Sequence, residues 1–146
     1  MLLDTPKLCI HYSATQHGTH VAGTIGAIGD NNIGVTGVIK DPTSFRLFAA
    51  RGLDDAGSGT NTQVMAAVAE CARNGAKVIN MSLGGSVDNP VTKGFYKDIY
   101  NKGILIVAAT GNVAVNEDFF PASFPFVISV VAVDNEENLY HNTVNR

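Results

Sequence analysis

The chain has 146 residues, of which 45% are hydrophobic, with a formal net charge of -3 and a sequence pI near 5.7. This length corresponds to one domain or part of one, and the apolar content is enough for a core, which excludes a disordered chain. The acidic balance offers no basic patch, so we expect neither nucleic acid nor a membrane surface as a partner.

Neither the start of the chain nor its cysteines identify a compartment. Met1-Leu2-Leu3 runs straight into Asp4, without the basic start and long apolar run of a secretion signal. No later segment is apolar for long enough to span a membrane. Cys9 and Cys71 are far apart and fit no metal-binding or redox spacing, and Cys71 is expected on the buried face of a helix. The localisation therefore stays unassigned.

Hydrophobic periodicity predicts strands that alternate with helices. Residues 1–14 show no assignable pattern. The glycine after the second helix is its expected stop signal, and the N-cap candidate of that helix is Asn61. The third helix is expected to bury Val91, Phe95 and Ile99. The predicted helices are 17–28, 61–74 and 90–102, and the predicted strands are 45–50, 77–83, 104–109 and 126–133. Such alternation indicates an α/β protein with a parallel sheet covered by helices on both faces.

Two histidines, His17 and His20, begin a segment rich in glycine and alanine. By themselves they fit metal ligands, a general base beside a packed neighbour, or two ordinary helix residues. The zincin pattern needs histidines four residues apart with a glutamate between them, and it is absent. The density of glycines at 18, 23 and 26 predicts that other backbone packs close to this helix.

Residues just after the strands are the second place to search, because ligands of parallel sheets bind beyond the carboxyl ends of the strands. There the sequence has Ser82-Leu83-Gly84-Gly85 and Thr110-Gly111-Asn112. The amide of Asn112 can donate a hydrogen bond to a developing oxyanion, and Gly111 allows a sharp turn before it. The same residues also fit an ordinary turn.

As a whole, residues 17–24, His-Gly-Thr-His-Val-Ala-Gly-Thr, resemble the histidine motif of the subtilisin-like serine proteases. The resemblance implies that His17 is the general base and that His20 is a packed structural residue. It also implies that residues 108–112 form the oxyanion segment with Asn112 as donor, although Thr110 stands where many members have alanine. The implied fold has three layers, with a mainly parallel twisted sheet between helices, here incomplete at both ends.

Two further segments resemble the walls of the family's substrate cleft. Residues 80–85 are similar to the substrate-lining strand and residues 53–59 to the facing loop, so an extended polypeptide is the implied partner. The implied substrate-binding residues are Gly57, Ser58, Gly59, Ser82, Leu83 and Gly84. Residues 120–125 resemble a segment near the cleft in which the aromatic-proline bond is often cis.

The resemblance also implies a structural calcium loop near Asp30, Asn31 and Asn32. One short loop offers too few oxygen ligands for a six- to eight-coordinate ion, so turn chemistry is the favoured interpretation of these residues. No other cofactor and no catalytic metal is predicted.

Two members of the family's catalytic triad lack a clear match. The serine belongs to a Gly-Thr-Ser-Met-Ala-type helix start, which is absent, and neither Ser123 nor Ser129 fits it. Asp4-Thr5-Pro6 is a poor match to the aspartate motif because proline replaces glycine. We therefore expect residues 17–134 to be a partial peptidase domain that is inactive and poorly soluble alone, between unassigned segments 1–16 and 135–146.

Two alternatives remain at the level of the sequence. The chain could be a non-catalytic peptide-binding domain that has kept the cleft and lost the chemistry. It could also be a cysteine- or metal-dependent hydrolase that uses Cys9 or Cys71 with His17.

Overall fold

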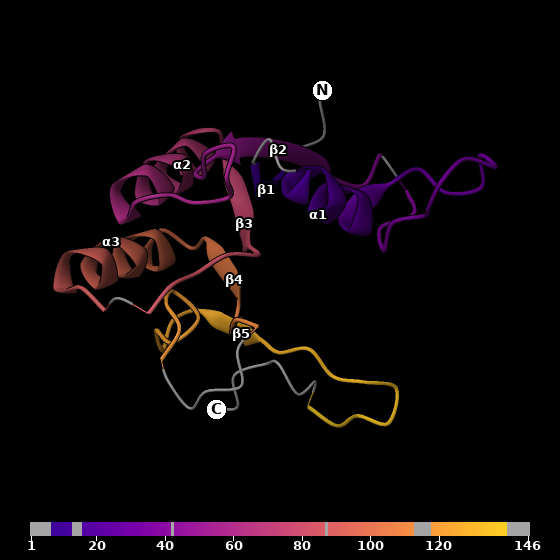
Figure 1. Ribbon diagram of the computed structural model, residues 1–146. Coiled ribbons are helices and arrows are strands. Elements are labelled where there is room, and N and C mark those ends of the chain that lie inside the picture. Colours follow the sequence, from indigo (N-terminus) through magenta and orange to yellow (C-terminus); the bar gives the residue numbers. More distant parts are fainter. Residues whose placement is uncertain (1–6, 13–15, 42, 87, 113–117, 140–146) are drawn as a thin grey trace. The chain divides into compact units, whose positions relative to one another are not determined.

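The computed structural model describes residues 7–12, 16–41, 43–86, 88–112 and 118–139 (Figure 1). The chain divides into two compact units, Met1–Ile79 and Asn80–Arg146. The elements in chain order are β1 (Lys7–Tyr12), α1 (His17–Gly26), β2 (Arg46–Arg51), α2 (Asn61–Arg73), β3 (Ala76–Met81), α3 (Pro90–Asn101), β4 (Leu105–Ala109) and β5 (Ile128–Val130). The strand order is β2-β1-β3-β4-β5, and the predicted α/β class is confirmed.

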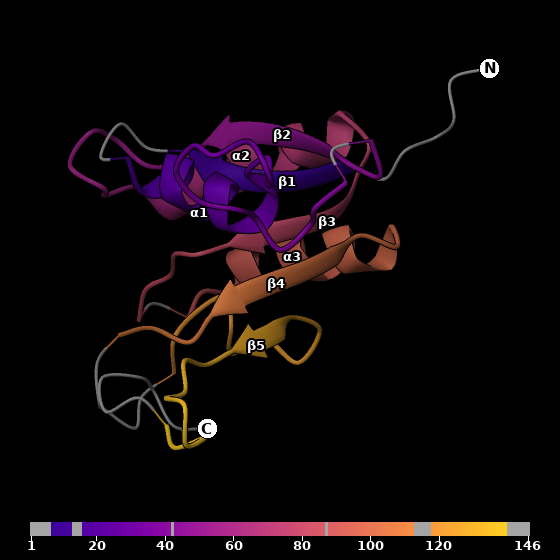
Figure 2. The same cartoon turned by 90° about the vertical axis from the view of Figure 1, so that its right-hand side faces the viewer.

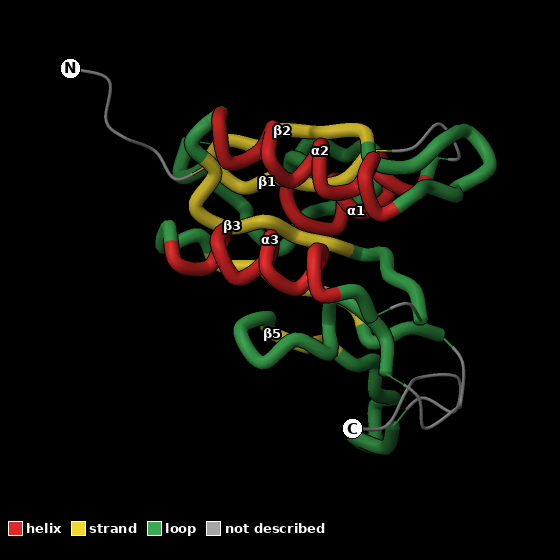
Figure 3. The backbone as a smooth tube through the Cα atoms, turned by 90° about the vertical axis from the view of Figure 1, so that its left-hand side faces the viewer, coloured by secondary structure: helices red, strands yellow, loops and turns green. Residues whose placement is uncertain are grey.

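In the first unit, β1 and β2 form a parallel ladder that runs from Lys7 opposite Arg46 to Tyr12 opposite Arg51. The helix α1 packs against β1, and α2 packs against β2. Figure 2 shows α1 in front of these strands, whereas α2 lies in front of them in Figure 3. The two helices therefore cover opposite faces of the ladder, as the alternating pattern predicts.

The strand β1 lies in the segment for which the sequence gave no pattern. Its central residues Cys9 and Ile10 are both almost completely buried. Because both faces of the ladder are covered, this short strand has no alternation of apolar and polar residues to mark it. It was missed for that reason.

The N-cap of α2 lies one residue earlier in the chain than predicted. Its N-cap is Thr60, whose hydroxyl accepts a hydrogen bond from the N–H of Gln63, while the Gln63 amide oxygen accepts from the N–H of Thr60. This reciprocal pair is a capping box, so the prediction of Asn61 as N-cap was wrong. The predicted stop is confirmed, since Gly75 follows the C-cap Asn74 and has a φ of 77°. The buried residues of α2 are Val64, Ala67, Val68 and Cys71.

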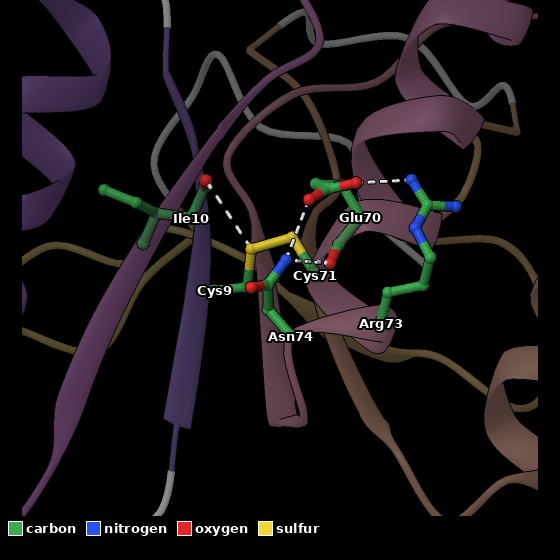
Figure 4. Close-up of a disulfide and its surroundings, with 6 residues drawn as sticks. All are labelled: Cys9, Ile10, Glu70, Cys71, Arg73 and Asn74. Carbon is green, nitrogen blue, oxygen red and sulfur yellow. Dashed lines mark hydrogen bonds and ion pairs between the residues drawn. A yellow bond between two sulfur atoms is a disulfide. The ribbon is translucent and has the colours of Figure 1, made fainter.

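A disulfide joins Cys9 of β1 to Cys71 of α2 (Figure 4). The two Cα atoms are 5.7 Å apart, a normal separation for a disulfide, and both residues are fully buried. Nearby, the Lys7 ammonium donates to the backbone oxygen of Asn74 over 2.9 Å, which ties the start of β1 to the end of α2. The buried position predicted for Cys71 is confirmed. The hypothesis of a cysteine-dependent hydrolase is wrong, because neither sulfur is a thiol.

The end of α2 carries a small polar cluster beside the disulfide. The Asn74 side chain donates to the backbone oxygen of Glu70 over 2.9 Å and to its carboxylate over 2.8 Å. Arg73 forms an ion pair with the same carboxylate (Figure 4). The hydrogen bonds from Arg73 and Asn74 hold the pKa of Glu70 below its usual range.

In the second unit, β4 and β5 pair in parallel, from Val107 opposite Ile128 to Ala109 opposite Val130. The three figures agree that α3 lies over one face of β4. The fifth strand is shorter than the predicted 126–133, and its three residues are exposed. Among the described residues, no helix is both long and apolar enough to cross a bilayer.

The buried face of α3 differs from the predicted one. The helix starts at Pro90 after the N-cap Asn89, whose side chain accepts a hydrogen bond from the N–H of Val91 over 2.8 Å. Its buried residues are Thr92, Tyr96 and Ile99, whereas Val91 is 71% exposed. The predicted and observed faces share Ile99 but are otherwise displaced by one residue, which is about 100° of helix rotation. The choice of Val91 was therefore wrong.

An aromatic cluster forms the core of the second unit. Phe124 is 2% exposed, and its ring lies 4.9 Å from that of Phe120, 5.5 Å from that of Phe126 and 5.9 Å from that of Tyr96. Burial raises the pKa of the Tyr96 hydroxyl above its ordinary value. The spacings are those of favourable ring contacts, so the cluster fixes α3 on the segment that follows β4.

Candidate active site

His17 is the first residue of α1 and is exposed. The residue before it, Gln16, is the N-cap and has left-handed backbone with a φ of 64°. The N–H of His20 donates to the Gln16 carbonyl over 2.9 Å, which closes the first turn. His20 is also exposed, so the packed role that the resemblance implied for it is not seen in this unit.

Backbone approaches α1 closely at one of its glycines. A Cβ built on Gly37 would lie 2.6 Å from the Cα of Gly26, and the ring of Phe45 also lies against Gly26. At Gly23, in contrast, a Cβ would meet no atom within 4 Å. The expected close approach is therefore confirmed at the end of the helix and was wrong at Gly23. The loop then runs back along the helix, held by three backbone hydrogen bonds. The N–H groups of Gly37, Val38 and Ile39 donate to the carbonyls of Ala27, Thr24 and Ile25, respectively.

The turn after α1 has the backbone expected of turn chemistry. Asp30 and Asn32 both have a φ of 58°, and the Asn31 side chain accepts a hydrogen bond from the N–H of Ile33 over 3.0 Å. Within the described residues, no group of three or more histidine, cysteine, aspartate or glutamate side chains is arranged to hold a metal ion. The calcium implied by the resemblance stays a prediction.

The loop after β2 contains three of the predicted substrate-binding residues, Gly57, Ser58 and Gly59, all exposed. The carboxylate of Asp54 accepts hydrogen bonds from the N–H groups of Ala56 and Ser58, each over 2.9 Å. Gly57 has a φ of 77°, and a Cβ on Gly59 would lie 2.5 Å from the Gly52 carbonyl oxygen. This compact turn leads directly into the Thr60 cap of α2, so the loop has a fixed shape.

The other three predicted substrate-binding residues follow β3 in the second unit. Ser82 and Leu83 are half-buried and Gly84 is exposed. The Asn80 side chain donates to the Ser82 hydroxyl oxygen over 3.0 Å, which orients that hydroxyl. The chain then pairs at Gly85, which exchanges two backbone hydrogen bonds of 2.9 and 2.7 Å with Phe120.

The predicted oxyanion donor Asn112 is exposed and follows the carboxyl end of β4. Gly111 before it has a φ of 99°, a backbone that glycine adopts without strain, so the sharp turn is confirmed. Thr110 is 3% exposed, and its N–H donates to the Val130 carbonyl over 3.1 Å. The residue that departs from the family pattern therefore anchors the end of β4 to β5.

Sequence reasoning missed Phe119, whose ring lies against both Gly84 and Gly111. The Phe120–Pro121 peptide bond that follows is cis, as the resemblance implied. The Ser123 hydroxyl accepts from the N–H of Phe119 over 2.8 Å and donates to its carbonyl over 3.0 Å. No local signal marks Phe119, because its neighbours come from two other strand ends.

The structure brings Gly84 and Gly111 of the second unit together around one ring, and it places His17 and residues 57–59 in the first unit. Asp4 lies outside the described residues. The hydroxyl of Ser129 donates to the Ala122 carbonyl over 2.5 Å. Like Ser123, it serves the local fold, which agrees with its poor match to the nucleophile motif.

The fold is a parallel α/β sheet, with a histidine at the start of α1 and an asparagine after β4. The family model described as the subtilase family matches residues 8–144. The chain belongs to the subtilase family.

Over the aligned residues, curated relatives are more than a third identical to this chain. Subtilisin DY of Bacillus licheniformis is 40% identical over 126 residues, which cover 84% of this chain and 44% of that protein. Thermitase of Thermoactinomyces vulgaris is 38% identical over 122 residues, covering 84% of this chain and 43% of that protein. The chain thus spans less than half the length of these relatives.

A solved structure agrees with the sequence comparisons. The psychrophilic subtilisin-like protease Apa1 from the Antarctic psychrotroph Pseudoalteromonas sp. AS-11 matches with a TM-score of 0.84 and 29% identity. The match covers 98% of this chain and 39% of that protein. The fold that the resemblance implied is therefore confirmed.

Proposed function

We propose that this chain supplies the general base and an oxyanion donor of a serine-type endopeptidase, together with two walls of its peptide-binding cleft. The observation that carries the proposal is the unbroken histidine motif at the start of α1 in a member of the subtilase family. The base is His17, the donor is Asn112, and the walls are residues 57–59 and 82–84.

The roles follow from the chemistry of acyl transfer. A serine hydroxyl attacks the peptide carbonyl while the imidazole of His17 takes its proton and later gives it to the leaving amine. The side-chain amide of Asn112 donates a hydrogen bond to the oxygen that becomes negatively charged. The exposure of both side chains leaves them accessible to a substrate.

The walls are suited to an extended polypeptide. Backbone groups after β3 and in the loop after β2 offer hydrogen bonds to a substrate strand, and the small residues at 57–59 leave room for it. Binding through the main chain favours polypeptides of loose sequence.

We infer that the serine of this mechanism lies outside the 146 residues. The absence of a Gly-Thr-Ser-Met-Ala-type segment supports this inference, as do the bonds of the Ser123 and Ser129 hydroxyls to local backbone. We therefore infer that the chain is part of a longer catalytic domain. Sequencing the transcript on both sides of this frame should show an aspartate motif upstream and the serine motif downstream. A frame that contains neither would favour the non-catalytic peptide-binding alternative.

The catalytic roles are tested in the protein encoded by the complete reading frame. His17→Ala should lower kcat by about 10⁶-fold and Asn112→Ala by about 10² to 10³-fold, magnitudes established on subtilisins themselves and carried over to this relative. His20→Ala is the matched control, since it removes an exposed imidazole from the same helix turn. Equal losses for His17→Ala and His20→Ala would contradict the assignment of the base.

A further inference from the structure

An asparagine and a glycine stand next to each other where α2 ends. Asn74 is the C-cap of the helix and is half-buried, and Gly75 follows it, exposed and with a φ of 77°. The sequence contains no other Asn-Gly pair. An asparagine is most prone to deamidation before a glycine, because glycine has no side chain to hinder the approach of its backbone nitrogen.

Deamidation of such a pair is a reaction between consecutive residues. The backbone nitrogen of Gly75 attacks the side-chain carbonyl carbon of Asn74, and a cyclic imide forms. The side-chain amide takes up the proton of that nitrogen and leaves as ammonia. Water then opens the imide at either carbonyl, which leaves aspartate or isoaspartate at position 74. The reaction consumes only water, and the two groups are held close by the covalent chain.

The structure holds both reacting groups in bonds that the reaction must break. The side-chain amide of Asn74 donates to the carboxylate of Glu70 over 2.8 Å and to its backbone oxygen over 2.9 Å (Figure 4). The N–H of Gly75 donates to the Ala72 carbonyl over 3.0 Å. The amide and the attacking nitrogen are thus bound to separate acceptors of α2, and they react only after these bonds open.

The carboxylate of Glu70 is the strongest of these acceptors. Hydrogen bonds from Arg73 and Asn74 hold its pKa below its usual range, so the carboxylate is charged at neutral pH. A hydrogen bond to a charged acceptor is stronger than one to a neutral carbonyl. Loss of this one carboxylate should therefore release the Asn74 amide more than the loss of any neutral acceptor.

We propose that Asn74 is a site of spontaneous deamidation and that the Glu70 carboxylate slows the reaction in the folded protein. The inference does not depend on the proposed function. Aspartate at position 74 would place a second carboxylate against that of Glu70, where the two charges repel each other. Isoaspartate would insert an additional carbon into the backbone at the helix end. Either product changes the residue whose carbonyl accepts from the Lys7 ammonium of β1.

The test uses the protein encoded by the complete reading frame, incubated at neutral pH with a serine-protease inhibitor. Peptide mass spectrometry follows the aspartate and isoaspartate forms of residue 74 over time. Glu70→Ala should raise the rate of their formation about tenfold, the effect expected from the loss of one charge-assisted hydrogen bond. Glu70→Gln retains an oxygen acceptor and should give a smaller rise. Circular dichroism verifies that each variant is folded.

Arg73→Ala is the matched control. It removes the exposed partner of the same carboxylate and leaves both bonds of the Asn74 amide in place. Its rate should stay within about twofold of that of the unsubstituted protein, since an exposed ion pair contributes little. A folded Glu70→Ala protein with an unchanged rate overturns the role of Glu70.

A synthetic peptide of residues 72–78 gives a second measurement that needs no variant. The peptide contains the Asn-Gly pair but neither the fold nor Glu70. It should deamidate faster than the folded protein by about tenfold or more, because its amide and its glycine nitrogen are free of the bonds in α2. Equal rates would overturn the restraint by the fold. A peptide that forms neither aspartate nor isoaspartate would overturn the site itself.

Discussion

The two units hold their strands and helices together by different means. In the first unit, β1 and β2 pair over six residues, and a buried disulfide ties β1 to α2. In the second unit, β4 and β5 pair over three residues, and the aromatic rings packed around Phe124 join α3 to the segment after β4. A disulfide thus attaches a helix to the rest of the first unit, and a packed aromatic cluster attaches a helix to the rest of the second.

This difference matters because each unit contains some of the predicted site residues. The disulfide constrains the strand that precedes His17, whereas the aromatic cluster supports the segment that positions Phe119. We therefore expect reducing agents to lower the stability of the first unit. Truncation of a buried aromatic side chain should lower the stability of the second unit. Each response should be confined to its own unit.

Loss of the disulfide should have the largest effect. The bond spans a sequence separation of 62 residues, for which the chain-entropy model gives about 4 kcal/mol of stabilisation. The free energy of unfolding of the protein encoded by the complete reading frame, measured in urea, should fall by about this amount on reduction. Hydrogen exchange should show the loss of protection in β1 and α2.

The double variant Cys9→Ala/Cys71→Ala is the control for this experiment. Its free energy of unfolding should be low both with and without a reducing agent, and the agent should not change it. A reduced protein that keeps its unfolding midpoint would show that the bond contributes little, and the contrast between the two units would then disappear.

Truncation of Phe124 should have the next largest effect, and in the other unit. The side chain is almost fully buried among three aromatic rings, so Phe124→Ala leaves a cavity and should cost about 3 kcal/mol. Hydrogen exchange should report the change in α3 and β4, with β1 and α2 unaffected. Phe124→Leu, which retains most of the volume, should recover more than half of the loss. A loss of protection that spread equally through both units would contradict their independence.

Local patterns predicted much of the fold and indicated the residues of the candidate site, whose roles stay predictions. The glycine stop at Gly75, the proline start of α3 and the apolar face of α2 are all local signals, and the structure confirms them. The histidine motif is also local, because consecutive residues of one helix turn carry it. Local signals were not always sufficient, since the N-cap of α2 and the buried face of α3 were predicted wrongly from short segments.

The other features that were missed depend on residues far apart in the chain. The disulfide joins two cysteines whose spacing suggested nothing, and β1 has no alternation because both its faces are covered. Phe119 gains its position only when two strand ends and a backbone pairing at Gly85 come together. Such features require the tertiary structure, and no window of local sequence contains them.

Removal of a helix cap should have the smallest effect on the free energy of unfolding. The same kind of substitution can be made in both units, so their costs can be compared directly. Thr60 caps α2 in the first unit and Asn89 caps α3 in the second, each by accepting a hydrogen bond from the helix backbone. Thr60→Ala and Asn89→Ala should each cost about 1 kcal/mol in the free energy of unfolding. Asn61→Ala should change it by less than about 0.5 kcal/mol, because Asn61 is already an exposed residue inside α2. If Asn61→Ala proved as costly as Thr60→Ala, the capping box at Thr60 and Gln63 would not be what begins this helix.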